Sequence, residues 1–256
     1  MSHDLFDIAG NVAIVTGGGR GLGAALADGF AAARARVVIG DQHAETAQVT
    51  AAAIRERGGT ALASQCDITN PTQVQALVDL AVRTYGALDI LVNNAGINIP
   101  KPAAELTIEE WNRIINVNLT GTFVCCQSGG MQMLRQGHGC IINICSVHGH
   151  VGSYVHQAAA YNASKAGVMN LTRSLALEWG EHNIRVNGIS PGPLRTELMA
   201  KRLADPDYLR KTLERIAIKR VGMPEDIVGA AVFLASPAAN WLTGQIIAVD
   251  GGWLAA

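Results

Sequence analysis

The sequence predicts a doubly wound α/β domain, in which helices flank both faces of a parallel sheet. Short apolar runs that suit buried strands alternate along the chain with longer segments of helical composition, and this alternation is typical of βαβ units with right-handed connections. Small or polar residues directly follow several of the apolar runs. In a parallel sheet these positions meet at the carboxyl edge, where ligands bind.

Seven apolar runs are expected to be the strands, at residues 11–16, 36–40, 60–65, 88–92, 140–145, 183–189 and 245–249. Helices are expected at about residues 24–33, 71–85, 107–136 and 158–179, and from 224 to just before 236. Asn70 and Thr107 are expected to cap two of them, with Gln73 and Glu110 completing capping boxes. The charged residues 197–221 have weak helical periodicity, and we expect a mobile lid at about 193–223.

Length and composition favour one domain over residues 1–256. Hydrophobic residues make up 49% of the chain and charged residues 16%, which is ample for one buried core. The net charge of -1 gives no basic face for nucleic acid. The apolar runs are too short to span a membrane.

The N-terminal residues and the cysteines both indicate the compartment of the protein. The first residues carry acids and no apolar signal core. The five cysteines, an odd number without a C-x-x-C pair, fit reduced thiols better than disulfides; they are Cys66, Cys125, Cys126, Cys140 and Cys145. We therefore expect a cytoplasmic protein.

A glycine-rich loop, Gly17-Gly-Gly-Arg-Gly-Leu-Gly23, follows the first expected strand and precedes a helix. This geometry presents backbone N–H groups and a helix N-terminus to a pyrophosphate, and glycines allow the backbone to approach it closely. The spacing is G-x-x-x-G-x-G rather than G-x-G-x-x-G, and a flexible turn is the alternative. We expect the loop to bind a dinucleotide through Gly17, Gly19, Arg20, Gly21, Leu22 and Gly23.

Asp41 ends the second expected strand, close to the ~20-residue spacing at which an acidic residue meets the adenosine ribose. A carboxylate there accepts hydrogen bonds from both ribose hydroxyls and repels a 2′-phosphate, which favours NAD over NADP. Arg20 is a counter-signal, because it could meet that phosphate. The alternative for Asp41 is that it only caps the next helix.

Polar residues end three further strands. Asp67, followed by Ile68, could accept a hydrogen bond from the adenine amino group, and Ser146 follows the fifth strand. The small residues Asn94, Ala95 and Gly96 can pack closely on a cofactor. Asn118 is a poor mid-helix residue, because its side chain competes for backbone groups. It could kink the helix around a bound water, or it could be an ordinary core-bonded Asn.

The polar loop after Ser146 contains His148, His150 and His156. An H-x-H pair could bind a metal, but no third ligand of fitting spacing accompanies it, so we predict no metal site. We expect these histidines, with Ser153 and Gln157, to line a polar substrate mouth or to face water.

Tyr161 and Lys165 are one helical turn apart and so share a helix face. A nearby ammonium stabilises the phenolate and lowers the tyrosine pKa from ~10 towards working pH, which suits a general acid/base. The alternative is a partly buried Tyr beside a solvated Lys.

Taken in order, these motifs resemble the short-chain dehydrogenase/reductase family. They are Thr16-Gly-x-x-x-Gly-x-Gly23, Asn93-Asn-Ala-Gly96, Asn118, Ser146, Tyr161-x-x-x-Lys165 and Pro191-Gly192, and the likeness covers residues 11–252. The resemblance implies a seven-stranded Rossmann-type sheet and a nicotinamide dinucleotide cofactor. It also implies a homotetramer built through the long helices and the last strand.

The resemblance also implies residue roles. Tyr161 would be the acid/base, and Ser146 would hydrogen-bond the reacting oxygen. Lys165 would bind the nicotinamide ribose and lower the Tyr161 pKa, and Asn118 would hold a water that links Lys165 to solvent. The remaining cofactor contacts are expected at Pro191, Gly192, Leu194 and Thr196, the last two placing the carboxamide.

The expected function is NAD-dependent hydride transfer between a secondary alcohol, such as a sugar, polyol or hydroxy acid, and its ketone. One alternative is a 3-oxoacyl thioester reductase, which would prefer NADP and is disfavoured by Asp41. Another is a regulatory protein that binds the cofactor without catalysis. Such a protein should have lost Tyr161, Lys165 or Ser146, and all three are present.

Overall fold

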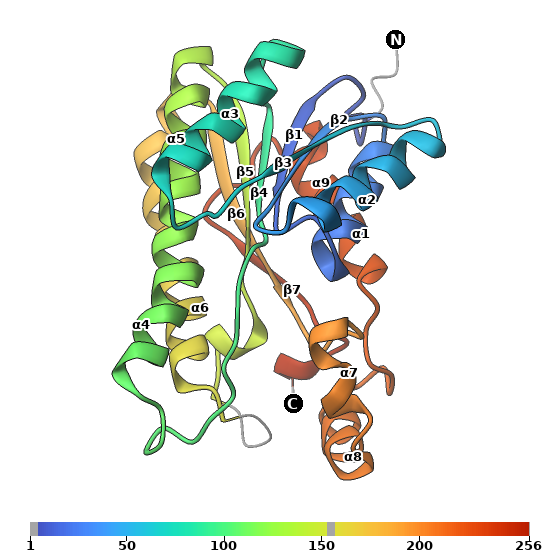
Figure 1. Cartoon of the computed structure of the whole chain (residues 1–256), viewed down its shortest axis with the longest axis vertical. Coiled ribbons are helices and arrows are strands. Elements are labelled where there is room, and N and C mark those ends of the chain that lie inside the picture. The colour runs from blue at the N-terminus through green and yellow to red at the C-terminus, as the bar shows by residue number, and fades with distance from the viewer. Residues whose placement is uncertain (1–4, 153–156, 256) are drawn as a thin grey trace.

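A computed structural model describes residues 5–152 and 157–255. Seven parallel strands form one sheet in the order β3-β2-β1-β4-β5-β6-β7 (Figure 1). The strands are β1 Val12–Thr16, β2 Arg36–Asp41, β3 Thr60–Gln65, β4 Ile90–Asn93, β5 Gly139–Ile144, β6 Ile184–Pro191 and β7 Ile246–Val249. The order reverses at β1, so β1 and β4 border the crevice where a doubly wound sheet binds ligands.

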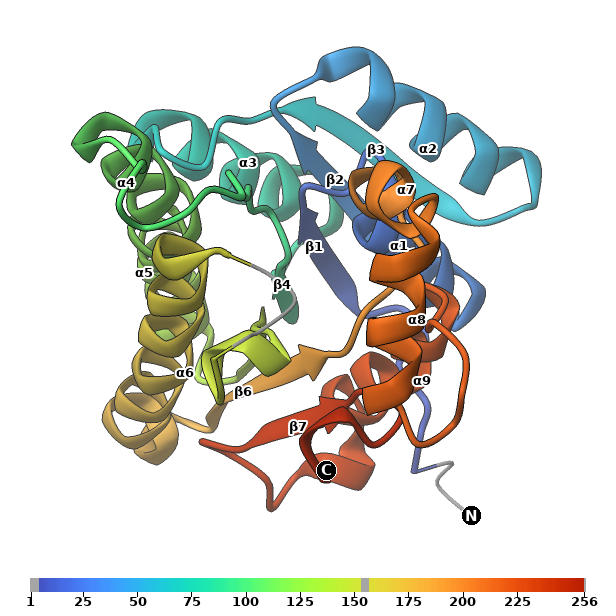
Figure 2. The ribbon, with the colours of Figure 1, turned by 90° about the horizontal axis from the view of Figure 1, so that it is seen from below.

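Helices cover both faces of this sheet (Figure 2). One layer consists of α1 Gly21–Ala32, α2 Ala44–Glu56 and α9 Glu225–Ala235, and the other of α3 Pro71–Tyr85, α5 Thr122–Gln136 and α6 Ala159–Trp179. The predicted doubly wound, Rossmann-type α/β domain with seven strands is confirmed.

Each face of the sheet has its own apolar core. Side chains alternate along a strand, so Val15 of β1 packs towards Phe30 on α1, while the neighbouring Ile14 packs towards Leu77 on α3. Both layers bury strand residues completely, which explains why the parallel strands read as continuous apolar runs. The sheet is therefore held from both sides, and its carboxyl edge is left to form a site.

The long helical region predicted for 107–136 is interrupted. It comprises α4 Ile108–Ile115, a π-helical turn Asn116–Gly121, and α5. The capping box predicted at its start is confirmed, because Thr107 and Glu110 satisfy each other's backbone N–H groups. Asn70 also caps α3, but Gln73 accepts from the Asp67 N–H instead of completing a capping box.

The segment predicted as a lid contains two short helices, α7 Glu197–Leu203 and α8 Pro206–Arg215. They lie beyond the carboxyl ends of the strands, close to the C-terminus (Figure 1). Asp205 caps α8 by accepting from the N–H groups of Asp207 and Tyr208. The mobility of this lid stays a prediction. Within the described ranges, no helix is long and apolar enough to cross a membrane.

Candidate active site

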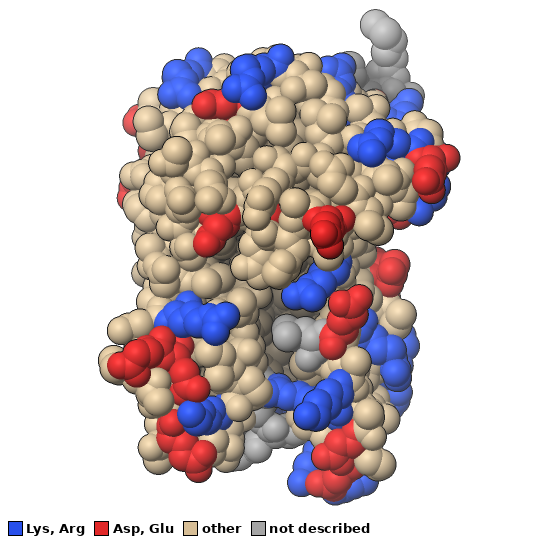
Figure 3. All heavy atoms as spheres, in the orientation of Figure 1, with Lys and Arg blue, Asp and Glu red and all other residues tan. Residues whose placement is uncertain are grey.

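A cavity of about 750 Å³ lies at the carboxyl edge of the sheet. Figure 3 shows the surface hollowed between the part that carries α4 and the part that carries α7 and α8, with Lys and Arg side chains near its rim. Most predicted site residues line the cavity: Gly17, Arg20, Gly21, Leu22, Gly23, Asp41, Asp67, Ile68, Asn94, Ala95, Gly96, Ser146, Tyr161, Lys165, Pro191, Gly192, Leu194 and Thr196. Gly19 and Asn118 lie behind this wall and support it.

The glycine loop fits a phosphate-binding role, although its glycines serve several purposes. A Cβ at Gly23 would collide with the Gly17 carbonyl, and one at Gly19 would lie 2.9 Å from Asp41 Oδ2. These two glycines are thus required by the packing of the chain itself. Gly21 has φ +54°, and the nearest atoms to a Cβ there are 3.8 Å away on Thr196, so its open side faces the cavity.

The N-terminus of α1 points at this loop without a capping side chain. Arg20 occupies the N-cap position and its side chain makes no capping hydrogen bond. The first N–H groups of a helix need acceptors, and the helix dipole favours an anion there. The residues present therefore fit the pyrophosphate of a dinucleotide.

Asp41 lies beside the loop with 7% of its surface exposed. Oδ2 accepts from the Gly19 N–H and Oδ1 from the His43 N–H, both at 3.0 Å. Each carboxylate oxygen keeps capacity for further donors, such as ribose hydroxyls. Arg20 extends towards the lid instead, with Nη1 4.0 Å from the Glu197 carboxylate.

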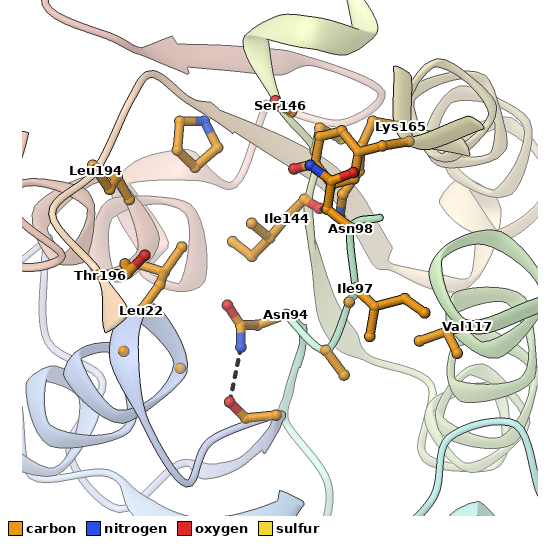
Figure 4. A pocket seen from close by; sticks show the side chains of 18 of the residues that line it. Leu22, Asn94, Ile97, Asn98, Val117, Ile144, Ser146, Lys165, Leu194 and Thr196 are labelled. Carbon is orange, nitrogen blue, oxygen red and sulfur yellow. Dashed lines mark hydrogen bonds between the residues drawn. The ribbon is translucent and has the colours of Figure 1, made fainter. Parts of the chain in front are cut away.

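Asn94 joins the end of β4 to the glycine loop. Its Nδ2 donates to the carbonyls of Thr16 and Gly17, both at 3.0 Å, and Figure 4 marks one of these bonds with a dashed line. The Thr16 hydroxyl accepts from the backbone N–H groups of Asn94 and Ala95. These bonds fix two neighbouring strand ends against each other and hold the floor of the cavity.

Ser146 and Lys165 lie across the cavity from Leu22 and Thr196 (Figure 4), and Tyr161 lines the same cavity. The Ser146 and Tyr161 side chains are hydrogen-bonded. Lys165 Nζ lies 5.8 Å from the Tyr161 ring centroid and donates to the Ile144 carbonyl at 2.7 Å. The end of β5 and one face of α6 thus supply a phenol, a hydroxyl and an ammonium to one place.

The electrostatics of this group differ from the prediction. Burial raises the pKa of Tyr161 above its ordinary value, and the hydrogen bond from Ser146 only partly opposes this. Burial also lowers the pKa of Lys165. The expected lowering of the Tyr161 pKa by Lys165 is therefore wrong for these side chains alone, because desolvation of the phenol outweighs an ammonium 5.8 Å from its ring.

Asn118 lies in the π-helical turn, fully buried. Its Oδ1 accepts from the Ile97 N–H at 2.8 Å, and its Nδ2 donates to the Ile97 carbonyl and to Ser164 Oγ. The side chain is thus the core-bonded Asn of the alternative interpretation. The helix is nevertheless irregular at this residue, and a water held by Asn118 stays a prediction.

The histidine-rich loop contributes only part of what we expected. His148 lines the cavity, and burial lowers its pKa to about 4, assisted by the positive charges of Arg215 and Arg202. His150 is exposed, with its Nε2 3.0 Å from Ser190 Oγ. Ser153 and His156 fall outside the described residues. Within residues 5–152 and 157–255, no three His, Cys, Asp or Glu side chains gather as metal ligands; the metal-free site stays a prediction.

Several cavity residues were not predicted, among them Asn98, Met199, Tyr208 and Trp253. Met199 and Tyr208 belong to the two lid helices, which the weak periodicity left undefined. A signal for Trp253 was available, because it follows the last strand at the carboxyl edge where ligands bind.

The chain is similar to known proteins over nearly its whole length. Residues 17–254 match the family model described as enoyl-(acyl carrier protein) reductase. The chain is 44% identical to 3beta-hydroxysteroid dehydrogenase 1 of Eggerthella lenta, over 96% of this chain and 94% of that protein. It is also 44% identical to cis-4-hydroxycyclohexanecarboxylate dehydrogenase of Sinomonas cyclohexanicum, over 96% and 98%.

A solved structure agrees with these relatives. It is a gluconate 5-dehydrogenase from Burkholderia cenocepacia in complex with NADP and tartrate, with a TM-score of 0.94 and 38% identity, covering 99% of this chain and 98% of that one. Fold, motif order and full-length similarity therefore agree that the chain belongs to the short-chain dehydrogenase/reductase family.

Proposed function

We propose that the chain is an NAD-dependent oxidoreductase that transfers a hydride between a secondary alcohol and the corresponding ketone. The observation that supports this most strongly is the meeting of Ser146, Tyr161 and Lys165 in the cavity that the glycine loop also lines. A phenol hydrogen-bonded to a hydroxyl, beside an ammonium, can exchange a proton with a substrate oxygen. The loop and the uncapped α1 supply the place for a dinucleotide.

The proposed chemistry divides the work between chain and cofactor. In alcohol oxidation the Tyr161 phenolate takes the hydroxyl proton, and in ketone reduction the phenol returns it. Ser146 donates a hydrogen bond to the reacting oxygen and holds it against Tyr161. When bound, the nicotinamide accepts or gives the hydride and, in its oxidised form, adds positive charge. Proton transfer of this kind contributes roughly 10²–10⁴-fold to the rate.

The preference for NAD over NADP belongs to this proposal. Asp41 supports it, because a nearly buried carboxylate beside Gly19 would repel the 2′-phosphate of NADP. The gluconate 5-dehydrogenase from Burkholderia cenocepacia is in complex with NADP. Similarity to this protein therefore gives no support for NAD as the cofactor of this chain. The charge of Asp41 decides our choice.

For the substrate we propose a sugar, polyol or hydroxy acid. Asn98, Ser146 and His148 give the substrate end of the cavity several polar groups, which favour a substrate with more than one oxygen. The relatives are named for a hydroxysteroid, a hydroxycyclohexanecarboxylate and gluconate. Their common feature is a hydroxyl on a saturated carbon skeleton, which agrees with a secondary alcohol.

A homotetramer and a cytoplasmic location complete the proposal. Phe123 and Met131 on α5, two turns apart, and Leu177 on α6 are large apolar side chains exposed on the same layer of helices. Large exposed apolar side chains on one layer of helices favour contact with another copy of the chain. All five cysteines are buried and free, which fits a reducing compartment.

The test is nicotinamide absorbance with purified protein and a panel of polyols, sugars, hydroxy acids and simple secondary alcohols, with NAD and NADP in parallel. The proposal expects turnover of one of the first three classes, faster with NAD. Cofactor binding without turnover of any alcohol or ketone in the panel would instead favour a regulatory protein.

A further inference from the structure

The C-terminal turn places an aromatic wall at the substrate end of the cavity. Trp253 belongs to the short 3₁₀ turn Trp253–Ala255 after β7, and it lines the cavity with only 2% of its surface exposed. Asp250 fixes this turn, because its two carboxylate oxygens accept from the N–H groups of Gly252 and Leu254 at 2.8 and 2.9 Å. The indole is thus held in place by its own segment of the chain.

Contacts of Trp253 place it beside the proposed catalytic group. The His148 ring meets the indole edge-on, with centroids 6.0 Å apart and an angle of 77°. The His148 backbone N–H in turn donates to Ser146 Oγ at 3.1 Å. Trp253 therefore stands on the Ser146 side of the cavity, away from the glycine loop, where a substrate and not the adenosine would lie.

A guanidinium stacks on the same indole. Arg215 is the last residue of α8, and its Cζ lies 4.6 Å from the Trp253 ring centroid. Arg215 Nη1 and Trp253 Nε1 are both buried, and neither has a hydrogen-bond acceptor among the described residues. A buried donor without an acceptor costs about 1–3 kcal/mol, and more when it is charged. The stacked pair therefore favours a ligand that brings acceptor atoms.

The surrounding charges favour an anion over a neutral acceptor. In the described parts of the chain, Arg215 forms no ion pair. The acidic residues on the cavity wall are Asp41, Asp67 and Glu197, of which Asp41 is bound to the glycine loop and Glu197 faces Arg20. The positive charge of Arg202 also reaches His148. Asp250 stands in the same turn as Trp253, but both of its carboxylate oxygens are already bound by backbone N–H groups, so Arg215 is the charge near the indole that no ion pair among the described residues balances.

We propose that the Trp253 indole forms a subsite for a carboxylate of the substrate, with the charge of Arg215, which stacks on the indole without itself lining the cavity, stabilising the anion. The enzyme then prefers a hydroxy acid or oxo acid, with the carboxylate at Trp253 and the reacting carbon near Tyr161, to a neutral alcohol of the same skeleton. A carboxylate gains from the indole N–H and from the nearby positive charge, whereas a hydroxyl gains only from the N–H. This narrows the proposed function to one substrate class and rests on it.

The first test compares two non-reacting ligands on the wild-type protein. Calorimetry with the cofactor-saturated protein measures the affinity for cyclohexanecarboxylate and for cyclohexanecarboxamide, which has the same shape without the charge. A charged hydrogen bond predicts roughly 10- to 100-fold tighter binding of the carboxylate. Equal affinities would overturn the subsite, and no variant is needed for that decision.

The second test assigns the preference to residues. The ratio of kcat/KM for 4-hydroxycyclohexanecarboxylate to that for 4-hydroxycyclohexanecarboxamide should fall roughly tenfold or more in Arg215→Gln, and less in Trp253→Phe, which keeps the ring. Arg210→Gln is the matched control, since Arg210 lies on the same helix, is exposed and pairs with Asp207 and Glu214. A ratio unchanged in Arg215→Gln would contradict the subsite, because a merely structural role lowers both values together.

The two proposals fail in different ways. Turnover of neutral and acidic alcohols at equal kcat/KM would refute the carboxylate subsite and leave the oxidoreductase function intact. No turnover of any alcohol or ketone with either cofactor would count against the proposed function. Tight binding of cyclohexanecarboxylate that Arg215→Gln weakens would still support the subsite, because calorimetry does not depend on turnover.

Discussion

Desolvation is the largest cause of the pKa shifts of individual residues in the site. It raises the pKa of Tyr161, lowers that of Lys165 and keeps His148 neutral. Each of these shifts disfavours the charged form of a side chain. In the proposed reaction, the positive charge of an oxidised nicotinamide would favour the Tyr161 phenolate against this desolvation, so proton transfer from an alcohol to Tyr161 would depend on bound cofactor.

The predicted preference for NAD over NADP depends on the charge of Asp41. Asp41→Asn keeps the size of the side chain and removes the charge, and its amide oxygen can still accept from one of the two N–H groups, of Gly19 and His43, that the carboxylate binds. We expect the ratio of kcat/KM for NADP to that for NAD to rise roughly tenfold, because one like-charge contact is lost. Steady-state kinetics with both cofactors measures the ratio.

Asp67→Asn is the matched control, since Asp67 also lines the cavity and accepts from its own neighbour Thr69. An equal rise of this ratio in both variants would mean that the total negative charge in the cavity, and not Asp41 in particular, sets the preference for NAD.

The lowered pKa of His148 predicts that the stability of the folded protein depends on pH. Its folded-state pKa of about 4 lies below its ordinary value of 6.5, so the folded protein binds fewer protons than the unfolded chain. This contribution to stability is present above pH ~6.5 and is lost as the pH falls towards ~4. At about 1.4 kcal/mol per pKa unit, roughly 1–3 kcal/mol is lost.

Denaturant unfolding of wild type and His148→Gln between those pH values isolates this contribution, because all other groups are common to both proteins. The wild type should lose more stability on acidification than the variant. Parallel curves for the two proteins would show that His148 titrates normally.

Among the elements, the π-helical turn Asn116–Gly121 most clearly joins fold and site. It lets the buried Asn118 side chain bind both backbone groups of Ile97 and the Ser164 hydroxyl. Ser164 is next to Lys165 and donates to the Tyr161 carbonyl. The turn therefore fixes the cavity loop after β4 against α6, the helix that carries Tyr161, the proposed acid/base.

Asn118→Ala should lower both stability and activity. It removes the partners of three buried polar groups, each worth about 1–3 kcal/mol when left unsatisfied, so we expect the free energy of unfolding to fall by roughly 2–4 kcal/mol. Asn112→Ala serves as the control, because Asn112 lies on α4 and is exposed. Equal stability of the two variants, measured by urea unfolding, would show that the contacts of Asn118 contribute little.

The elements also show what the sequence can predict. Residues 60–65 form the predicted strand with the predicted bounds, because apolar and polar residues there are bracketed by a glycine pair and by Cys66-Asp67. The helix α2 was not predicted, since its Ala- and Thr-rich face lacks a strong apolar period. The π turn and the two lid helices depend on tertiary contacts, such as Asn118 with Ile97, that no local pattern records.

The candidate site was predictable where residues follow strands directly. Asp41, Asn94 and Ser146 reach one cavity because parallel strands end at the same edge. Trp253 and Arg215 depend on how the C-terminal turn meets α8, so their contact follows only from the folded chain. The Tyr161 pKa was mispredicted because helical spacing shows a neighbouring ammonium but not the depth of burial.

At the scale of the whole molecule, one helical layer presents apolar side chains that the single chain leaves exposed. Phe123 is 41% exposed and Met131 51% exposed on α5. If this layer forms the proposed tetramer, Phe123→Asp combined with Met131→Asp should yield smaller species, because each charge would be buried without a partner. Light scattering after size-exclusion chromatography measures the mass.

Val49→Asp provides the control, since Val49 is 70% exposed but lies on α2 in the other layer. A double variant that keeps the mass of the wild type would place the interface elsewhere, and a wild type that is monomeric would remove the tetramer from the proposal.

In the proposed function, Tyr161 exchanges the proton while the cavity holds a nicotinamide cofactor. The most direct measurement is turnover of Tyr161→Phe with the best alcohol of the panel, together with cofactor affinity from calorimetry. We predict that kcat falls roughly 10²–10⁴-fold while the affinity for NAD stays nearly unchanged, because only one hydroxyl is removed. Turnover close to that of the wild type would contradict the claim and assign the proton transfer to another group.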